Sequence, residues 1–333
     1  MMIFSLAAVA ALSAPGAPAC SPVTYAALTA PARANEKPFD LSCSVTLEKG
    51  DNIYRRLRLA GPSASRVLID CNGGAIGYDG MVAELRRRGG AELSPFAVPT
   101  VKIVSLREGA TWSPPVDIVI RRCTIYGATQ IMGMEGSQLL SPSREKNFTS
   151  IAQKNAPGRI TIADSALVSY WHVPLYIGAG ANEVTLVHSE VKGVGDLGIY
   201  LDHESARNRI IGNTFTIRPK REMIAVDGSA YNVISGNRIQ LSEHDGVYLY
   251  RNCGENGVVR HQTPSNNRVM DNTFVIPEGS KLQPVVVNSR SAAAKKQAYC
   301  HLDDGFPFGS SKDDNDNGVA NTVENNRVIT EAR

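Results

Sequence analysis

The sequence predicts an all-β fold in which short strands stack into a solenoid. Segments of similar pattern recur at a nearly fixed spacing: Asp202 and Asp227 lie 25 residues apart, and Asp227 and Tyr250 lie 23 residues apart. β-Branched residues are dense after residue 100, and Gly, Asn, Ser and Asp residues separate strands of about five residues. Such regular repetition favours stacked rungs over a sheet of hairpins.

A second strand in each repeat has a sharper pattern, in which an apolar residue stands three positions before a small polar one. The polar positions are Cys123, Ser165, Ser189, Asn213, Asn237, Asn272 and Asn326. The step between them is 24 residues from Ser165 to Asn237, and it then lengthens to 35 and to 54 residues. The extra residues therefore form two long loops, at about 251–266 and 289–320.

This repeat resembles the single-stranded right-handed parallel β-helix, with rungs of about 24 residues. The resemblance covers roughly residues 60–330 and rests on the repeats Asn208–Phe215, Asn232–Ile239 and Asn267–Phe274. It implies that Ile, Val, Leu and Phe side chains stack inside into one core, while Asn side chains at the corners bond neighbouring rungs. Leucine-rich repeats share the period, but their Leu-dense consensus is absent here.

The chain divides into three expected parts. Residues 1–19 are apolar and end in Ala17-Pro18-Ala19, which is typical of a secretory signal peptide and too short for a transmembrane helix. Residues 20–60 are expected to cap the open end of the stack, and residues 61–333 to form the β-helix with its long loops. A short helix is expected only at 81–86. We therefore expect a secreted or periplasmic protein with no membrane span.

The composition restricts the class of partner. The chain has 333 residues, of which 43% are hydrophobic and 20% charged, as in a folded domain with a sizeable core. Its formal net charge is +3, and no basic block or basic helix is present, which argues against nucleic acid as the main partner. No phosphate-binding glycine loop and no Gly-x-Ser-x-Gly motif occurs in the sequence.

The six cysteines include no C-x-x-C pair, which disfavours a zinc site or a redox motif. Neighbouring strands lie about 4.8 Å apart, which is within the Cα separation of disulfides. Cys71 occupies the polar position of its repeat, as Cys123 does, so these two are expected to pair. The expected disulfides are Cys71–Cys123, Cys253–Cys300 between the two long loops, and Cys20–Cys43 in the cap. The alternative is six free buried thiols.

Alternation along the strands determines which face each side chain occupies. The residues expected to point inward are Leu201, Val226 and Leu249. Their neighbours then point outward on one common surface, the outward wall, which comprises Tyr200, Asp202, Asp227, Tyr248 and Tyr250. The two long loops emerge beside this wall, and loops on a rigid scaffold often carry function.

Two stacked carboxylates suggest cleavage of a glycosidic bond, with one acid and one base or nucleophile. Asp202 and Asp227 are the expected pair, and His203 and Arg251, just past the strands, complete the expected catalytic set. Tyrosine rings can stack on sugars, and Arg and His provide directional hydrogen bonds. The expected substrate-binding residues are Tyr200, Tyr248, Tyr250, Arg221, His244, Arg260 and His261. The first hypothesis is therefore a glycoside hydrolase.

Proteins with similar repeats include polygalacturonase-like hydrolases, pectate-lyase-like enzymes and mannuronan epimerases, which implies a polysaccharide or oligosaccharide substrate. The polygalacturonase signatures Asn-Thr-Asp, Gly-His-Gly and Arg-Ile-Lys are absent. The epimerase motif Asp-Pro-His-Asp is only echoed by Asp202-His203-Glu204. The resemblance therefore implies the substrate class and leaves the reaction open.

Two other hypotheses stay open. One is elimination or C5 epimerisation of a uronate, in which Tyr200, Tyr250 or His203 removes the C5 proton and Arg221 or Arg251 stabilises the carboxylate. The other is a non-catalytic glycan-binding surface protein.

Residues 313–324 match the calcium-loop pattern D-x-[DN]-x-[DN]-G-x5-E. The following segment, 321–328, has the pattern of a rung rather than of the helix that such a loop needs. The simpler interpretation is an acidic turn between rungs. No metal site is assigned and no cofactor is expected to be required, with Ca²⁺ in this loop as the alternative.

Overall fold

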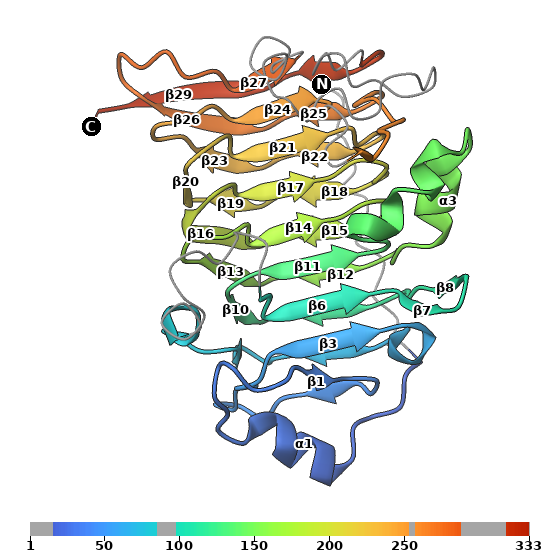
Figure 1. Cartoon of the computed structure of the whole chain (residues 1–333). Coiled ribbons are helices and arrows are strands. Elements are labelled where there is room, and N and C mark those ends of the chain that lie inside the picture. The colour runs from blue at the N-terminus through green and yellow to red at the C-terminus, as the bar shows by residue number, and fades with distance from the viewer. Residues whose placement is uncertain (1–15, 85–97, 253–256, 288–317, 333) are drawn as a thin grey trace, which may run out of the picture.

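The computed structural model describes residues 16–84, 98–252, 257–287 and 318–332. In this part of the chain three parallel sheets wind into a solenoid (Figure 1). The chain passes from the first sheet to the second, turns sharply into the third, and returns to the first on the next rung. The parallel β-helix predicted from the repeat is confirmed.

The strands of each sheet follow one another in rung order. The first sheet contains β1 (Phe39–Asp40), β3 (Leu57–Ala60), β6 (Val101–Val104), β11 (Thr129–Met132), β14 (Leu175–Ile177), β17 (Ile199–Leu201), β21 (Ile224–Asp227), β24 (Val247–Tyr250) and β27 (Val285–Val287). The second contains β2 (Val45–Thr46), β4 (Leu68–Asp70), β9 (Val119–Arg121), β12 (Thr161–Ala163), β15 (Thr185–Val187), β18 (Arg209–Ile211), β22 (Val233–Ser235), β25 (Arg268–Met270) and β28 (Thr322–Glu324). The third contains β5 (Ala75–Ile76), β10 (Thr124–Tyr126), β13 (Ala166–Ser169), β16 (Glu190–Gly195), β19 (Thr214–Phe215), β23 (Arg238–Gln240), β26 (Thr273–Pro277) and β29 (Arg327–Glu331), and β20 (Arg218–Pro219) pairs with β16.

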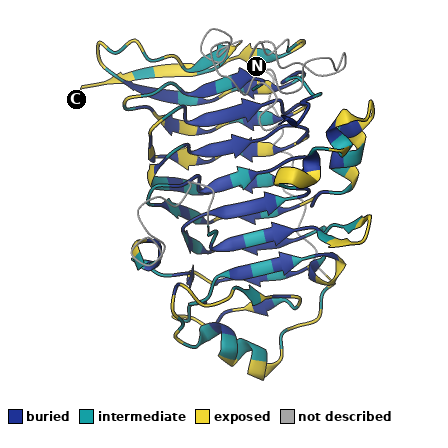
Figure 2. Cartoon of the chain, in the orientation of Figure 1, coloured by how far each residue is buried: buried dark blue, intermediate teal, exposed yellow. Residues whose placement is uncertain are grey.

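Inward side chains of all three sheets form one apolar core along the axis. In the second sheet the register partners from rung to rung are Ile120, Ile162, Leu186, Ile210, Ile234 and Val269. All of them are fully buried, and Figure 2 shows the strands as the buried part of the molecule. Each such side chain contributes about 1.5–3 kcal/mol. Leu201, Val226 and Leu249, expected to point inward, belong to this core.

Asparagines at the corner of successive rungs form a hydrogen-bonded ladder. Asn237 Nδ2 donates to Asn272 Oδ1 at 2.9 Å, and Asn272 Nδ2 donates to Asn326 Oδ1 at 2.9 Å. Toward the N-terminus, Ser189 and Ser165 occupy the same position, and the hydroxyl of Ser189 accepts from the backbone N–H of Ser165 at 3.1 Å. A second ladder contains Asn208, Asn232, Asn267 and Asn321. The ladders satisfy backbone groups that the sheets leave unpaired.

A residue with positive φ precedes the strands of the second sheet by two positions. Over five rungs these residues form a charged column that alternates in sign: Arg66, Asp117, Arg159, Glu183 and Arg207. Arg159 Nε lies 2.6 Å from Asp117 Oδ1, and Arg207 Nε lies 3.7 Å from Glu183 Oε1. These side chains are about half exposed, so each pair contributes roughly 0–1 kcal/mol.

Helix α1 (Pro22–Thr29) covers the N-terminal end of the core. The hydroxyl of Ser21 accepts from the backbone N–H of Thr24 at 3.1 Å and caps the helix, while Leu28 is fully buried. The expected cap, residues 20–60, also contains strands that already belong to the solenoid, because β1 pairs with β3 and β2 pairs with β4. Regular pairing therefore begins at about residue 39 rather than at residue 61.

The expected signal peptide, residues 1–19, is described only from residue 16. The backbone N–H of Ser44 donates to Pro18 O at 2.7 Å, and Ala19 forms a parallel bridge with Ser44. These contacts extend the second sheet at the N-terminal end. Cleavage directly after Ala19 would remove them.

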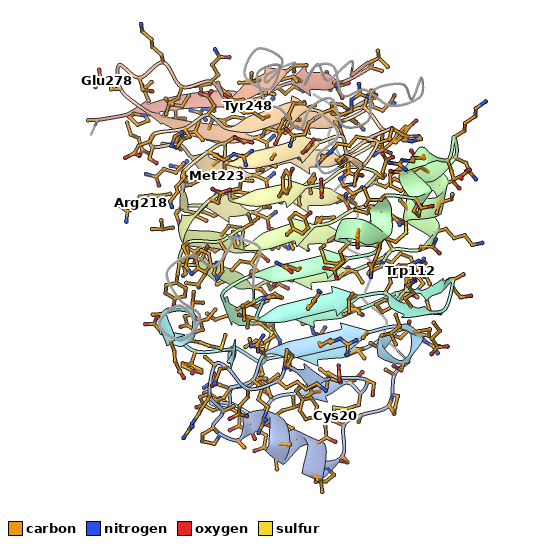
Figure 3. All side chains as sticks on the ribbon, viewed as in Figure 1. Cys20, Trp112, Arg218, Met223, Tyr248 and Glu278 are labelled. Atoms are coloured by element: carbon orange, nitrogen blue, oxygen red, sulfur yellow. A yellow bond between two sulfur atoms is a disulfide. The ribbon has the colours of Figure 1, made fainter. Side chains whose placement is uncertain are left out.

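The connections that follow the first sheet carry most of the irregular elements. β7 (Leu106–Glu108) and β8 (Thr111–Ser113) form a hairpin that presents Trp112 (Figure 3). After β11 come η2 (Gly136–Leu139), η3 (Pro142–Arg144) and α3 (Phe148–Lys154). They pack around a second apolar group, the satellite cluster, which consists of Met134, Leu139, Phe148, Ala152, Ala179 and Val258.

The helices differ from the sequence-based expectation. The helix expected at 81–86 is described only over its first four residues, which are helical. Neither α1 nor α3 was expected, because each has fewer than nine residues and lacks a long amphipathic pattern. Helix α3 packs close to Gly180, where a Cβ would come within 2.4 Å of the backbone of Ala152. In the described part of the chain no helix is long and apolar enough to cross a membrane.

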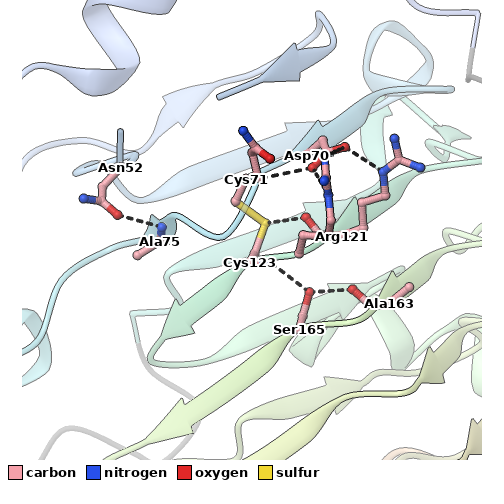
Figure 4. The surroundings of a disulfide bond; sticks show 10 residues. Asn52, Asp70, Cys71, Ala75, Arg121, Cys123, Ala163 and Ser165 are labelled. Atoms are coloured by element: carbon pink, nitrogen blue, oxygen red, sulfur yellow. Dashed lines mark hydrogen bonds and ion pairs between the residues drawn. A yellow bond between two sulfur atoms is a disulfide. The ribbon is translucent and has the colours of Figure 1, made fainter. Parts of the chain in front are cut away.

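Two of the three expected disulfides are present. Cys20 pairs with Cys43, and Cys71 pairs with Cys123, each with a Cα–Cα distance of 4.9 Å. Figure 4 shows that the second bridge continues the polar ladder, because the backbone N–H of Cys123 donates to Ser165 Oγ at 3.1 Å. The third expected pair, Cys253–Cys300, lies outside the described residues, as do most of the loop 289–320 and the first five residues of the 313–324 motif.

Candidate functional site

The residues of the outward wall lie on one face of the first sheet. Asp227 and Tyr250 are register partners, and Asp202 stands one rung before Asp227 because Leu201 pairs with Val226. The wall differs from expectation in its exposure. Asp227 and Tyr250 have no exposed surface, and Asp202 is only 5% exposed. Figure 3 shows Tyr248 on the same sheet, where it is half-buried.

Arg260 holds the two aspartates together. Its Nη1 donates to Asp227 Oδ2 at 2.9 Å and to Asp202 Oδ1 at 3.4 Å. Asp227 also accepts from the Tyr200 hydroxyl, and from the backbone and side-chain amides of Asn252, both at 2.7 Å. All three charged side chains are buried, so removing Arg260 would take away the cation that lies between the two carboxylates.

His203 and Asp202 form a dyad with a defined tautomer. His203 Nδ1 lies 2.8 Å from Asp202 Oδ1, and the backbone N–H of His203 donates to the same oxygen at 2.8 Å. Because a carboxylate accepts, Nδ1 carries a proton, and in the neutral form of such a ring the lone pair is on Nε2. This Nε2 is buried and has no hydrogen-bond partner within the described residues. A carboxylate that orients an imidazole in this way is a common arrangement for a general base.

Burial and neighbouring charges shift the pKa values of the site residues in different directions. Burial alone would raise the pKa of Asp202, but the charges of His203 and Arg260 and the hydrogen bonds from His203 and Tyr176 hold this pKa well below its usual range. Burial and the charge of Asp202 raise the pKa of Tyr176, and burial and the charge of Asp227 raise that of Tyr200. Both tyrosines are therefore neutral donors and poor bases at neutral pH.

A loop around residues 257–263 covers the wall and is held by Glu204. Glu204 is fully buried, directly follows the dyad, and has a φ of +60°. Its Oε1 accepts from the backbone N–H groups of His261 at 2.7 Å and Gln262 at 3.1 Å. Its Oε2 accepts from the hydroxyl of Thr149, in α3, at 2.5 Å. One carboxylate therefore attaches both covering segments to the rung that carries His203.

Beside the wall, Arg221 belongs to a separate charged group. Arg221 Nη2 donates to Glu222 Oε1 at 3.0 Å and to the Tyr250 hydroxyl at 3.2 Å, and Nη1 lies 3.7 Å from Asp196 Oδ2. Its expected role as a binder of the substrate carboxylate competes with these contacts. Arg221 is thus paired with Asp196 and Glu222, whereas Asp227 is paired with Arg260.

The other expected site residues are distributed more widely. Arg251 is buried, at 4% exposed. His261 supports the covering loop, because its Nε2 donates to Ser143 O at 2.7 Å and its ring packs edge-on against Phe148. Tyr248 donates to Asp245 at 2.8 Å. His244 is half-buried, and no contact among the described residues joins it to the dyad.

A cavity of about 420 Å³ lies against the dyad. His203 and Arg260 form its polar side. Leu139, Leu140 and Val258 form an apolar side, while Gly136 and Ser137 are the exposed lining residues. Such a volume is within the range of small-molecule sites. The unpartnered Nε2 of His203 therefore belongs to a residue that lines a space able to receive a ligand.

A larger hollow of about 840 Å³ follows the turn between the second and third sheets. Its polar lining includes Arg122, Asp164 and His188, all with exposed side chains. No buried polar atom without a partner faces it among the described residues. Volume alone therefore does not make it the better candidate. No group of three or more His, Cys, Asp or Glu suited to a metal ion occurs in the described ranges.

Sequence reasoning missed several residues of the site. The ring of Tyr176 packs at a tilt against that of Tyr200, with 5.4 Å between the ring centroids. Tyr176 is the register partner of Tyr200, so the repeat could have identified it. Asn252 and Glu204 gave no periodic signal. Leu139 lies in an insertion outside the repeat, so its approach to His203 depends on tertiary packing.

The fold and this site define the molecule as a parallel β-helix protein with a covered polar site on one wall. Residues 118–291 match the family described as right handed beta helix region, which is more than half of the chain. The chain belongs to this family. The fold is common among polysaccharide-active enzymes. A search of the curated proteins finds no match.

Proposed function

We propose that this protein is an exported polysaccharide-active enzyme that acts on a uronate by proton abstraction, with His203 as the base. The observation that carries the proposal is the dyad: Asp202 holds Nδ1 of His203, Nε2 is buried and unpartnered among the described residues, and His203 and Arg260 both line the cavity. A base beside a cation suits removal of a proton next to a carboxylate.

In the proposed elimination, Nε2 of His203 takes the proton from C5 of the uronate. The electron pair of the C5–H bond forms the C4=C5 double bond, and the C4–O glycosidic bond breaks. The imidazolium then returns its proton to the leaving oxygen, so atoms and charge balance without another reactant. Arg260 stabilises the charge that develops on the uronate carboxylate, and Asp202 stabilises the imidazolium. Epimerisation would instead require a second group or a water molecule to deliver a proton to the opposite face of C5, while His203 keeps the abstracted proton.

The contacts support this reaction over hydrolysis by paired aspartates. A general acid needs a raised pKa, whereas the pKa of Asp202 is lowered by His203 and Arg260 despite burial. The oxygens of Asp227 already accept four hydrogen bonds. Among the proposed bases, Tyr200 is disfavoured because burial and Asp227 raise its pKa.

Export is part of the proposal. Disulfides persist in oxidising compartments, and the two bridges support a secreted or periplasmic location. The apolar stretch at residues 1–19 supports the same conclusion.

A digestion screen tests the activity. Wild-type protein and His203→Gln are incubated with acidic and neutral polysaccharides, and the new double bond is followed by ultraviolet absorbance while products are read by mass. We expect absorbance only with acidic polymers, and a decrease in kcat of about 10²-fold or more in the variant. His188→Gln is the control, because His188 is exposed and lines the larger hollow instead of the cavity. This variant should keep wild-type activity. Products that have gained water without a double bond would support hydrolysis instead.

A further inference from the structure

The cavity beside His203 has two chemically different sides. A bare sugar ring is surrounded by hydroxyls, each of which needs a hydrogen-bond partner when it is buried. Leu139, Leu140 and Val258 cannot provide one, and Ser137 is the exposed lining residue with a hydroxyl. The apolar side therefore matches a ligand group that carries carbon rather than oxygen at its end.

The residues of the apolar side are held in place by packing. Leu139 and Val258 are 6% and 8% exposed and belong to the satellite cluster, and Leu140 packs against the same cluster. Glu204 fastens the loop that carries Val258 and Arg260 through the amides of His261 and Gln262. The positions of the leucines relative to the dyad are therefore supported by covering segments that are attached to the solenoid.

We propose that this cavity receives a short acyl group, an acetyl substituent of the sugar on which His203 acts. The methyl group contacts Leu139, Leu140 and Val258, while Arg260 stays with the uronate carboxylate. A volume of about 420 Å³ accommodates one sugar residue with such a substituent. The inference rests on the proposed function for its reacting sugar, and it adds that an acetylated polymer is the preferred substrate class.

Binding measured by calorimetry tests the inference separately from turnover. The probes are oligosaccharides of O-acetylated polymannuronate, in which the uronate itself carries the acetyl group, and the same oligosaccharides after mild alkaline removal of the esters. We expect the deacetylated form to bind about tenfold more weakly, which is the usual value of one small apolar group in a fitted pocket.

Two variants link the preference to the cavity. Val258→Thr keeps the side-chain shape and adds a hydroxyl, and Leu140→Asn makes the half-buried leucine polar. Both should reduce the tenfold preference to less than about twofold, while Ile151→Asn, which borders the satellite cluster but not the cavity, should keep it. Circular dichroism confirms that each variant is folded.

Equal binding of acetylated and deacetylated probes, binding of none of them, or a preference unchanged in Val258→Thr would each overturn the inference. These outcomes are distinct from failure of the proposed function. Loss of the elimination signal with a retained acetyl preference would contradict the reaction and keep the pocket. A double-bond signal in the wild-type protein without any acetyl preference would support the reaction and contradict the acetyl pocket.

Discussion

At the scale of single residues, the central feature is an arginine between two carboxylates rather than a free carboxylate pair. Arg260 cross-links Asp202 and Asp227, while His203 lines the cavity and its Nε2 has no hydrogen-bond partner among the described residues. Two stacked aspartates therefore need not be an acid and a base. Here one orients an imidazole and the other anchors the loop that contains Asn252.

Asp202 should make stability depend on pH. Its pKa is depressed in the folded state, so its contribution is present above about pH 4 and is lost as the pH falls below that value. We expect Asp202→Asn to lower the free energy of unfolding by on the order of 3 kcal/mol at neutral pH. The difference between wild type and variant should shrink in acid, as measured by urea denaturation at several pH values.

The matched control is Asp40→Asn, because Asp40 is paired with Arg58 on the same sheet but its side chain is 55% exposed. That variant should change the free energy of unfolding by less than about 1 kcal/mol at any pH. If the Asp202→Asn difference were constant from neutral pH to about pH 3, the depressed pKa of Asp202 would be contradicted.

At the scale of elements, the polar ladder changes its chemistry along the molecule. The N-terminal positions hold a disulfide and two serines, and the C-terminal positions hold asparagines. A serine hydroxyl reaches one neighbouring amide, whereas an asparagine both accepts from one rung and donates to the next. Asn237 accepts from Asn213 N at 2.9 Å and donates to Ile210 O at 2.8 Å and to Asn272 Oδ1 at 2.9 Å.

Replacement of one ladder asparagine should therefore cost more than replacement of a ladder serine. Asn237→Ala leaves buried groups of two neighbouring rungs unpaired, and each costs about 1–3 kcal/mol. We expect a loss of roughly 3 kcal/mol, against about 1–2 kcal/mol for Ser189→Ala, both by chemical denaturation. If both variants lost a similar amount of unfolding free energy, the additional hydrogen bonds of the asparagine side chain would contribute little to stability.

The elements also show what the sequence could and could not predict. The rungs, the ladder and two disulfides follow from a period that repeats locally, so Cys71 could be placed above Cys123 from counting alone. The covering segments have no period. Leu139 and Val258 come from insertions on different rungs, and their meeting above His203 depends on packing between segments about 120 residues apart. For the same reason Asp202 was predicted to be exposed, whereas it is buried.

At the scale of the whole molecule, both disulfides among the described residues lie at the N-terminal end of the solenoid. The Cys71–Cys123 bridge closes a separation of 52 residues and the Cys20–Cys43 bridge one of 23 residues. The chain-entropy relation gives roughly 4 kcal/mol for the longer loop and roughly 3 kcal/mol for the shorter. These two bridges therefore stabilise the end that carries α1.

Reduction should weaken the fold accordingly. We expect the double variant Cys71→Ser, Cys123→Ser to unfold at lower denaturant, with a loss of roughly 4 kcal/mol, because serine suits the ladder position but cannot cross-link it. A reductant should cause the same loss of stability in the wild-type protein. It should also remove the contribution of the Cys20–Cys43 bridge. A denaturation curve that a reductant leaves unchanged would contradict a stabilising role for these bridges.

The charged column along the entry to the second sheet has a consequence for how this solenoid can change in length. Its signs alternate from rung to rung over Arg66, Asp117, Arg159, Glu183 and Arg207, so the pattern has a period of two rungs. Deletion or duplication of a single rung there would bring two like charges into register, whereas an even number would preserve the alternation. Each clash is small, on the order of 1 kcal/mol or less, yet it would bias gain and loss of rungs in this part of the chain toward pairs.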